Sequence, residues 1–408
     1  MVTTMESMRT VVENELQLHR YTPSQFSKLA GIRIEQLDYP RSVTIEQLDK
    51  IASVLGQSPG WLYELYLGQC FLNDQLTCSQ QFSLAESLFE QGKKKEAIPL
   101  YRQIVDKGNA EDPQYVMSQF RLFQSLIGTG VEENREAVFR FETHYKHLPE
   151  DVRLDALLQM ANIYYTFERW DKVGQYADEL RELATAIYEK QIHRELHQPL
   201  QTERHLVVYY GQGCLMKGVV LTKLEQYEEA KRYVQEYSDL SWFQGLDEVG
   251  KKEVEKFRVW GKGNGLILEL NTGNLKVLPE LSVYLEEFPN QILPSLSVVM
   301  KAANRYQFSV DAILSKFEQR IPTVGTITDH IHGTQLFHFW YEKVIYSFKR
   351  GGKHQALNEL IHALGLAQKL RYYSGFERCV SLFWKHVDRA TEQQKKEYEK
   401  ILEGVSVS

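Results

Sequence analysis

Residues 82–108 decide the fold, because they form two amphipathic segments joined at a glycine. They read FSLAESLFEQGKKKEAIPLYRQIVDKG. Small or apolar residues recur every three or four positions in each segment, as they do along one face of an α-helix. Ala85 and Leu88 fall on the first segment, Gly92 at the turn, and Ala97 and Tyr101 on the second. The stretch therefore predicts an antiparallel pair of helices.

The same arrangement recurs along the chain with a period of about 34–45 residues, which is typical of stacked helical repeats. Two further units carry small and apolar residues at matched places: Ala161, Tyr164, Val173, Ala177 and Leu180, then Gly218, Leu221, Ala230, Val234 and Tyr237. Weaker copies cover residues 113–148, 252–288, 294–320 and 333–369. A single pair cannot bury its apolar face, so the repeats must stack. We expect an all-α fold in which residues 81–408 form a right-handed α-solenoid.

The beginning of the chain follows a different pattern of short helices. Thr22-Pro23-Ser24-Gln25 has the form of a capping box, and Gly31 is a natural stop for the helix that it opens. Thr44 begins a helix that runs through Leu55, and Ser58-Pro59 predicts the start of another. We expect a compact head over residues 1–66 and a linker over 67–80. At the other end, Thr391 and Gln394 predict a capped, polar closing helix.

Composition excludes several classes of protein. The chain has 408 residues and a formal net charge of −6, and no stretch approaches the apolar length of a membrane span. Glu6, Glu13 and Glu15 interrupt the first twenty residues, which argues against a signal peptide. The four cysteines show no metal-type pairing and no disulfide framework. The expectation is a cytoplasmic protein with no membrane contact, no metal and no cofactor.

The head is similar to helix-turn-helix domains of the Cro/repressor type. The matching elements are Tyr21-Thr22, Phe26-Ser27, Gly31-Ile32, Ile45-Glu46-Gln47-Leu48, Ala52 and Leu55-Gly56. In that family the helix after the turn lies in the major groove of DNA. The corresponding segment here is residues 33–43, which is about one helical turn shorter than is usual in the family. Pro40 also ends its helix early.

The resemblance implies which side chains of the head would contact double-stranded DNA. Arg33 and Gln36 would read base edges, since Arg favours guanine and Gln favours adenine. The expected phosphate contacts are Thr22, Ser24, Lys28 and Arg41. Residues 1–66 hold six Lys and Arg against eight Asp and Glu, so binding would depend on a few well-placed cations. The alternative is a degenerate head that serves only packing or dimerisation.

The repeats are similar to the tetratricopeptide superfamily, whose first helices line a concave surface. Residues offset by one position from the small packing residue would face that surface. They are Asn162, Tyr165, Gln212, Leu215, Lys301 and Asn304. Asn and Gln amides offer a donor and an acceptor to an extended peptide, and Lys301 could meet a carboxylate. Each residue taken alone could instead be a solvated side chain or an interhelical contact.

A repressor-type head followed by such repeats resembles the RRNPP family of peptide-sensing transcriptional regulators. The resemblance is architectural and spans nearly the whole chain, and the short recognition segment is loosely similar to the phage arbitrium-receptor branch. It implies a homodimeric quorum-sensing receptor that binds a short linear oligopeptide and changes its DNA binding in response. The alternative is a tetratricopeptide adaptor that binds and regulates a signalling protein through the repeats, with a head that does not bind DNA.

No enzyme motif emerges. Gly261-Lys262-Gly263-Asn264-Gly265 is rich in glycine, but it lacks the strand and the spacing of a nucleotide-binding loop. Close packing between repeats explains it better. We expect no catalytic site.

Overall fold

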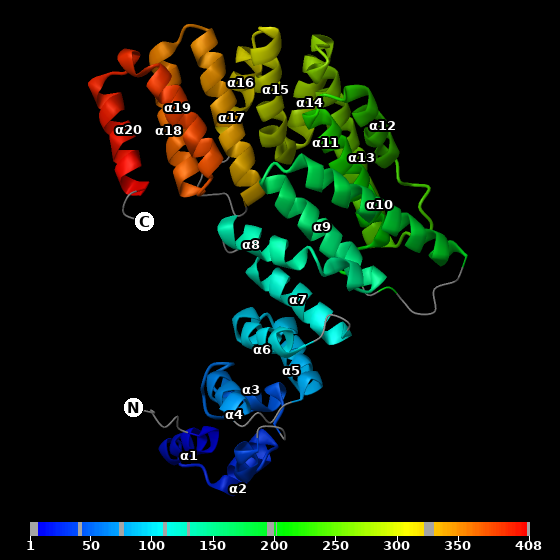
Figure 1. Ribbon diagram of the computed structural model, residues 1–408, viewed down its shortest axis with the longest axis vertical. Helices are drawn as coiled ribbons and strands as arrows, with labels where there is room; N and C mark the ends of the chain where they lie inside the picture. Colours follow the sequence, from blue (N-terminus) through cyan, green and yellow to red (C-terminus); the bar gives the residue numbers. More distant parts are fainter. Residues whose placement is uncertain are drawn as a thin grey trace. The chain divides into compact units, whose positions relative to one another are not determined.

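The computed structural model describes residues 7–39, 43–72, 77–108, 112–128, 131–193, 200, 202–321 and 330–405. The chain divides into two compact units, residues 1–127 with 139–148, and residues 128–138 with 149–408. Within the described ranges the regular structure is entirely helical, which confirms the all-α prediction, and helices pack mainly against their neighbours in sequence, consistent with an α-solenoid (Figure 1). No described helix has both the length and the apolar character needed to cross a membrane.

Unit 1 begins with short helices. They are α1 (Met8–Leu18), α2 (Pro23–Ala30), the 3₁₀ helix η1 (Ile34–Asp38), α3 (Ile45–Val54) and α4 (Tyr63–Leu72). The capping boxes at Thr22 and Thr44 are present, and Gly31 ends α2 with a φ of 73°. The predicted start at Ser58-Pro59 is wrong, since α4 begins at Tyr63. Gly60 has a φ of 90° and cannot join a helix.

The first helix pair of the repeats shares one hydrophobic core with these short helices. The pair consists of α5 (Cys78–Glu90) and α6 (Lys94–Lys107), and α7 (Pro113–Leu126) and the 3₁₀ helix η3 (Tyr145–His147) complete the unit. Asp49 on α3 accepts hydrogen bonds from the Tyr63 hydroxyl at 2.8 Å and from Lys93 Nζ at 3.0 Å. Desolvation opposes the charge of Asp49, but these hydrogen bonds prevail and lower its pKa. The polar contact therefore ties the head to the α5–α6 turn.

Unit 2 consists of successive helix pairs, which stand side by side in Figure 1. The pairs are α9 (Glu150–Thr166) with α10 (Trp170–Ile192), α11 (Leu206–Lys223) with α12 (Tyr227–Ser238), α13 (Glu248–Asn271) with α14 (Leu278–Glu287), α15 (Ile292–Tyr306) with α16 (Asp311–Phe317), α17 (His330–Lys349) with α18 (Lys353–Lys369), and α19 (Tyr373–Lys385) with α20 (Glu392–Val405). Short 3₁₀ helices lie between some of them: η4 (Leu275–Val277), η5 (Pro289–Gln291), η6 (Glu318–Arg320) and η8 (Val387–Arg389). Helix α8 (Val131–Phe141) crosses the boundary between the two units.

The turn inside most pairs contains one residue with positive φ. These residues are Gly92, Gly128, Glu168, Glu225, Gly273, Gln307 and Gly351. The left-handed conformation lets the chain reverse within a few residues and costs glycine nothing. For a residue with a Cβ it costs roughly 1 kcal/mol. Glu168, Glu225 and Gln307 are therefore strained where other pairs use glycine.

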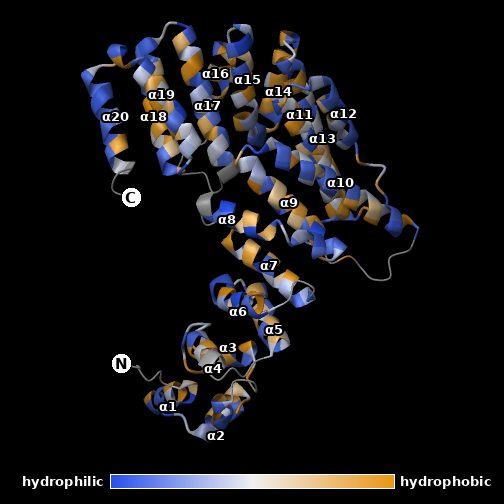
Figure 2. Cartoon of the chain, viewed as in Figure 1, coloured by the Kyte–Doolittle hydropathy of each residue, from blue (hydrophilic) through white to orange (hydrophobic). Residues whose placement is uncertain are grey.

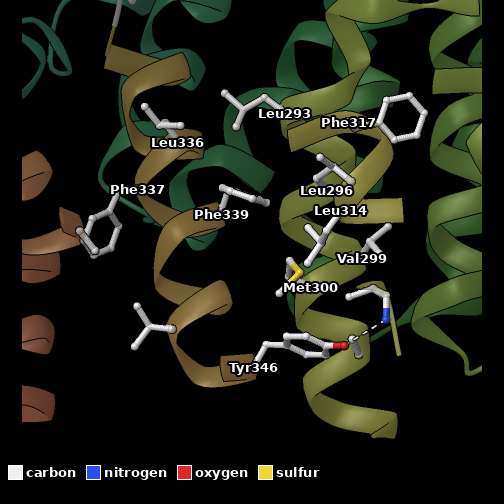
Figure 3. Close-up of a cluster of buried hydrophobic side chains, with 14 of the residues drawn as sticks. Leu293, Leu296, Val299, Met300, Leu314, Phe317, Leu336, Phe337, Phe339 and Tyr346 are labelled. Carbon is white, nitrogen blue, oxygen red and sulfur yellow. Dashed lines mark hydrogen bonds between the residues drawn. The ribbon is translucent and has the colours of Figure 1, made fainter. Parts of the chain in front are cut away.

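The core between α15, α16 and α17 shows how the first helices of neighbouring pairs are held together (Figure 3). Leu296 and Met300 of α15 pack toward Leu336 and Phe339 of α17. At one end, the Tyr346 hydroxyl accepts a hydrogen bond from the Val310 backbone at 3.2 Å and donates to Asp311 at 2.8 Å. These hydrogen bonds join α17 to the start of α16, beside the apolar contact between α15 and α17.

The last helix is mostly hydrophilic (Figure 2), as expected of a helix that closes a stack. Its predicted cap is confirmed, because Gln394 N donates to the Thr391 hydroxyl at 3.2 Å and Thr391 N donates to Gln394 Oε1 at 3.0 Å. Gln394 also donates to Asn358 of α18 at 2.6 Å. The cap therefore joins α20 to the preceding pair.

The glycine-rich segment at residues 261–265 lies within α13 and serves packing. Gly261 lies against Ser238 of α12, so that an added Cβ would sit 2.9 Å from the Ser238 Cα. Gly263 lies against the Tyr284 ring of α14. Gly265 faces open space. Two of these glycines therefore let neighbouring helices approach α13.

We expect Gly261→Ala to lower the free energy of unfolding by about 1–3 kcal/mol, because the new methyl group would collide with backbone that cannot easily move. Gly265→Ala is the matched control. It adds a methyl group in open space on the same helix and should be neutral or stabilising by up to about 1 kcal/mol. Urea unfolding of both variants measures the difference. Equal effects at the two positions would contradict the packing role of Gly261.

A buried carboxyl group ties the segment before α11 to α9. Asp155 accepts hydrogen bonds from the Tyr209 hydroxyl and from the Glu203 backbone, the latter at 3.1 Å. The Asp155 residue is 4% exposed. Desolvation raises its pKa to about 6, against the opposing effect of the Tyr209 hydrogen bond. Folding therefore favours the protonated form of this acid.

Because the folded-state pKa of Asp155 is raised, the native state binds the extra proton between about pH 4 and pH 6. This group therefore makes the wild type less stable as the pH rises through that window. Asp155→Asn cannot ionise, so its stability relative to the wild type should increase from pH 4 to pH 7, on the order of 2 kcal/mol. Melting temperatures of both proteins measured across this range test the expectation. A difference that stays constant with pH would contradict it.

Candidate functional site

Charged side chains from non-neighbouring helices of unit 2 come together in what we call the inner cluster. It consists of Glu168, Lys223, Lys301, His338 and Glu342. The first helices α9, α11, α13, α15 and α17 contact one another in succession, and α17 also contacts α9. The stack therefore curves enough for its first helices to face one another, and the inner cluster lies where they do.

Glu168 connects the first pair of unit 2 to helices much later in the chain. One carboxylate oxygen lies 3.0 Å from His338 Nε2 on α17 and accepts a hydrogen bond from the Tyr372 hydroxyl at 3.3 Å. The hydrogen bond and charge of His338, with Lys223 nearby, lower the pKa of Glu168 to about 2 despite desolvation. The acid is thus held ionised at the strained turn between α9 and α10.

A second turn acid makes a similar contact. Glu225, between α11 and α12, pairs with Arg305 at the end of α15 at 2.8 Å. Its pairing partner is about half exposed, so the energy gained is small. Two of the three strained turns, at Glu168 and Glu225, thus place a carboxylate against a helix that is distant in sequence.

Lys223 ends α11 and reaches solvent, although protein surrounds much of its side chain. Its Nζ lies 5.3 Å from the centre of the Trp170 ring, which in turn meets Tyr165 edge to face at 5.5 Å. Desolvation, followed by repulsion from Lys301, lowers the pKa of Lys223, and the attraction of Glu168 and Glu342 does not compensate. The site thus holds a cation at an energetic cost.

The predicted peptide-binding residues on α15 lie at this site, but in different ways. Lys301 is exposed. Asn304 is 7% exposed, and its amide donates to the Glu342 backbone oxygen at 2.9 Å and to the Glu342 carboxylate at 2.8 Å. Its side-chain oxygen is buried without a partner among the described residues. Asn304 therefore holds Glu342 in place.

The other predicted residues lie on α9 and α11. Tyr165 is half-buried beside Gln335 of α17, and desolvation raises the pKa of its hydroxyl. Asn162, Gln212 and Leu215 are half-buried as well. Within the described part of the chain, neither Asn162 nor Gln212 has an assigned side-chain hydrogen bond. Their role in binding stays a prediction.

A pocket of about 160 Å³ lies beside Glu168. This is close to the volume of an apolar cavity that holds a benzene ring. Its lining combines aromatic, cationic and hydroxyl side chains: Asn134, Arg135, Thr166, Phe167, Glu168, Thr334, Leu370, Arg371, Tyr372, Tyr373 and Ser374. Glu168 and Tyr372 belong both to the pocket and to the bridge between α9 and α17. A side chain bound in the pocket would therefore touch the bridge.

In the head, the segment after the turn differs from the expected recognition helix. It is the 3₁₀ helix η1, whose Ile34 and Leu37 are buried at a spacing of three residues. Gln36 Oε1 accepts a hydrogen bond from Arg33 N at 2.8 Å, so this predicted base-reading amide also caps the helix. The side chain of Arg33 is exposed. The Gln36 side chain thus satisfies a backbone N–H at the start of η1, and the short helix offers little length to enter the major groove of DNA.

The predicted phosphate contacts Thr22, Ser24 and Lys28 are exposed on or beside α2. The Thr22 hydroxyl is bonded to Gln25 in the capping box. Arg41 lies outside the described residues. The described part of the chain contains no group of three or more His, Cys, Asp or Glu side chains that could hold a metal ion.

No protein-family model matches the chain, and no curated protein is significantly similar to it.

Sequence reasoning missed Glu168, Lys223, His338 and Glu342. The signal was present for two of them. The inward stripe through Asn162 and Tyr165 continues at helical spacing to Glu168, and the stripe through Gln212 and Leu215 continues to Lys223. Extending the first stripe two residues past the end of α9, and the second to the last residue of α11, would have identified both charges.

We expect Glu168→Ala and His338→Ala to be coupled by about 0.5–1 kcal/mol in a double-mutant cycle of unfolding free energies, because each removes the same partly exposed ion pair. Arg169→Ala with Asp171→Ala is the matched control. That pair has similar geometry, at 2.9 Å, but its side chains are 57% and 61% exposed within one turn. Its coupling should be close to zero. A coupling for Glu168 and His338 no larger than for the control would show that the bridge contributes nothing.

Proposed function

We propose that this protein is a receptor for a short linear peptide that binds across the inner cluster of unit 2 and thereby changes the binding of DNA by the head. The observation that carries the proposal is the convergence of unlike polar groups from α9, α11, α15 and α17. An extended peptide presents donors, acceptors and charges along its length, and these groups match it. The resemblance of the whole architecture to the RRNPP family supports the same conclusion.

The bridge at Glu168 suggests how binding would be transmitted. It joins α9 to α17 and to the turn before α19, which the sequence separates widely. A peptide that contacts these helices together would change the curvature of the stack, since each pair touches only its neighbours elsewhere. In a homodimer that change would alter the spacing of two heads on DNA. A coupling of about 1–3 kcal/mol is enough for such a switch. We expect the protein to act in the cytoplasm.

One observation favours a second candidate, a tetratricopeptide adaptor that regulates a signalling protein. The segment that would read bases is a 3₁₀ helix of 5 residues, and Gln36 is engaged in capping it. The head would then serve only to pack against α5 and α6, where Asp49 meets Lys93.

The two candidates differ at Arg33. In a selection from random duplex DNA with the full chain, the first predicts an enriched sequence and a loss of about 1–3 kcal/mol in its binding for Arg33→Ala. Arg20→Asn is the control. It removes another cation of the head, and Asn tolerates the φ of 58° at that position. Failure to enrich any sequence, or equal binding by Arg33→Ala, would favour the adaptor.

A further inference from the structure

Two cations of the inner cluster lack a direct ionic partner. Among the described residues, neither Lys223 nor Lys301 forms an ion pair, although both are exposed and each lies within electrostatic range of the other. Other lysines of unit 2 are paired with acids, as Lys217 is with Asp178 and Lys231 is with Glu269. The ion pair between Glu225 and Arg305 joins the end of α11 to the end of α15, so the two unpaired cations lie on adjoining helix ends.

The acids near these lysines are engaged elsewhere. Glu168 binds His338 and Tyr372. Glu342 is held by the Asn304 amide, which contacts both its carboxylate and its backbone oxygen. Neither acid can turn toward a lysine without losing these hydrogen bonds. The protein thus fixes the two anions and leaves the two cations open.

The surroundings of Lys223 destabilise its charged ammonium group, so that a bound anion would stabilise it. The Trp170 ring contacts the Lys223 ammonium group and excludes water from that side of it. The Tyr165 ring packs edge to face against Trp170. Desolvation and repulsion from Lys301 lower the pKa of Lys223. An anion placed between the two ammonium groups would relieve both effects. The charges of Glu168 and Glu342 balance those of the lysines, which suits a monoanion better than a phosphate dianion.

We propose that Lys223 and Lys301 together bind one carboxylate group of the peptide, either its C-terminus or an Asp or Glu side chain. This rests on the proposed function and specifies which chemistry the peptide must carry. Trp170 then acts as a positioning residue for Lys223, and Asn304 keeps Glu342 from occupying the site.

Affinity selection with the full chain and pools of random hexapeptides tests the proposal. The first pool has a free C-terminus and no Asp or Glu, the second has an amidated C-terminus and contains Asp and Glu, and the third has neither kind of carboxylate. We expect enrichment from the first or the second pool, and which one identifies the source of the carboxylate. Enrichment from the third pool as strong as from the others would overturn the carboxylate site while leaving the peptide receptor intact. No enrichment from any pool would overturn both.

Variants then locate the contact. For an enriched peptide, Lys223→Gln and Lys301→Gln should each weaken binding about tenfold or more, as loss of a hydrogen bond to a charged group does. The control is Lys251→Gln, which removes the same charge from an exposed ion pair with Glu248 on α13. It should bind as the wild type does. Unchanged affinity in both lysine variants, with folding confirmed by circular dichroism, would overturn the assignment.

Discussion

The structure depends on one constraint. A single pair of helices has apolar surfaces on two sides, and it can bury them only by packing against neighbouring pairs. Each seam of unit 2 meets it in the same way, with large residues such as Leu296 and Phe339 filling the space between first helices (Figure 3). Glycines at Gly261 and Gly263 allow the closest approaches. The polar helix α20 ends the series. Because the stacking curves, it also creates an inner face that no single pair possesses.

Charged and packing side chains occupy opposite sides of the same helices. On α15, Met300 is buried against α17 while the next residue, Lys301, reaches solvent. Asn304, one turn later, bridges the two environments through Glu342. Packing on one side of the helices thus holds charged groups on the other side close together, although desolvation and repulsion between like charges oppose this arrangement.

The helices could be predicted from the sequence because periodicity and caps are local signals. Thr22, Thr44 and Thr391 each cap a helix as expected, and the repeat units fall on helix pairs. The start of α4 was misplaced because the role of Gly60 depends on its contact with Asp49, which is distant in sequence. The inner cluster was missed in part for the same reason. Only the curvature of the stack brings Glu168 to His338, and no local pattern encodes that distance.

The left-handed backbone at Glu168 bears on which amino acids this position would accept in evolution. Glycine would relieve the backbone strain at this turn, as Gly92 and Gly351 do in other pairs, but it would remove the carboxylate that pairs with His338. The same replacement would disconnect α9 from α17. Selection for a relaxed backbone and selection for the contact with His338 therefore act in opposite directions at this one position.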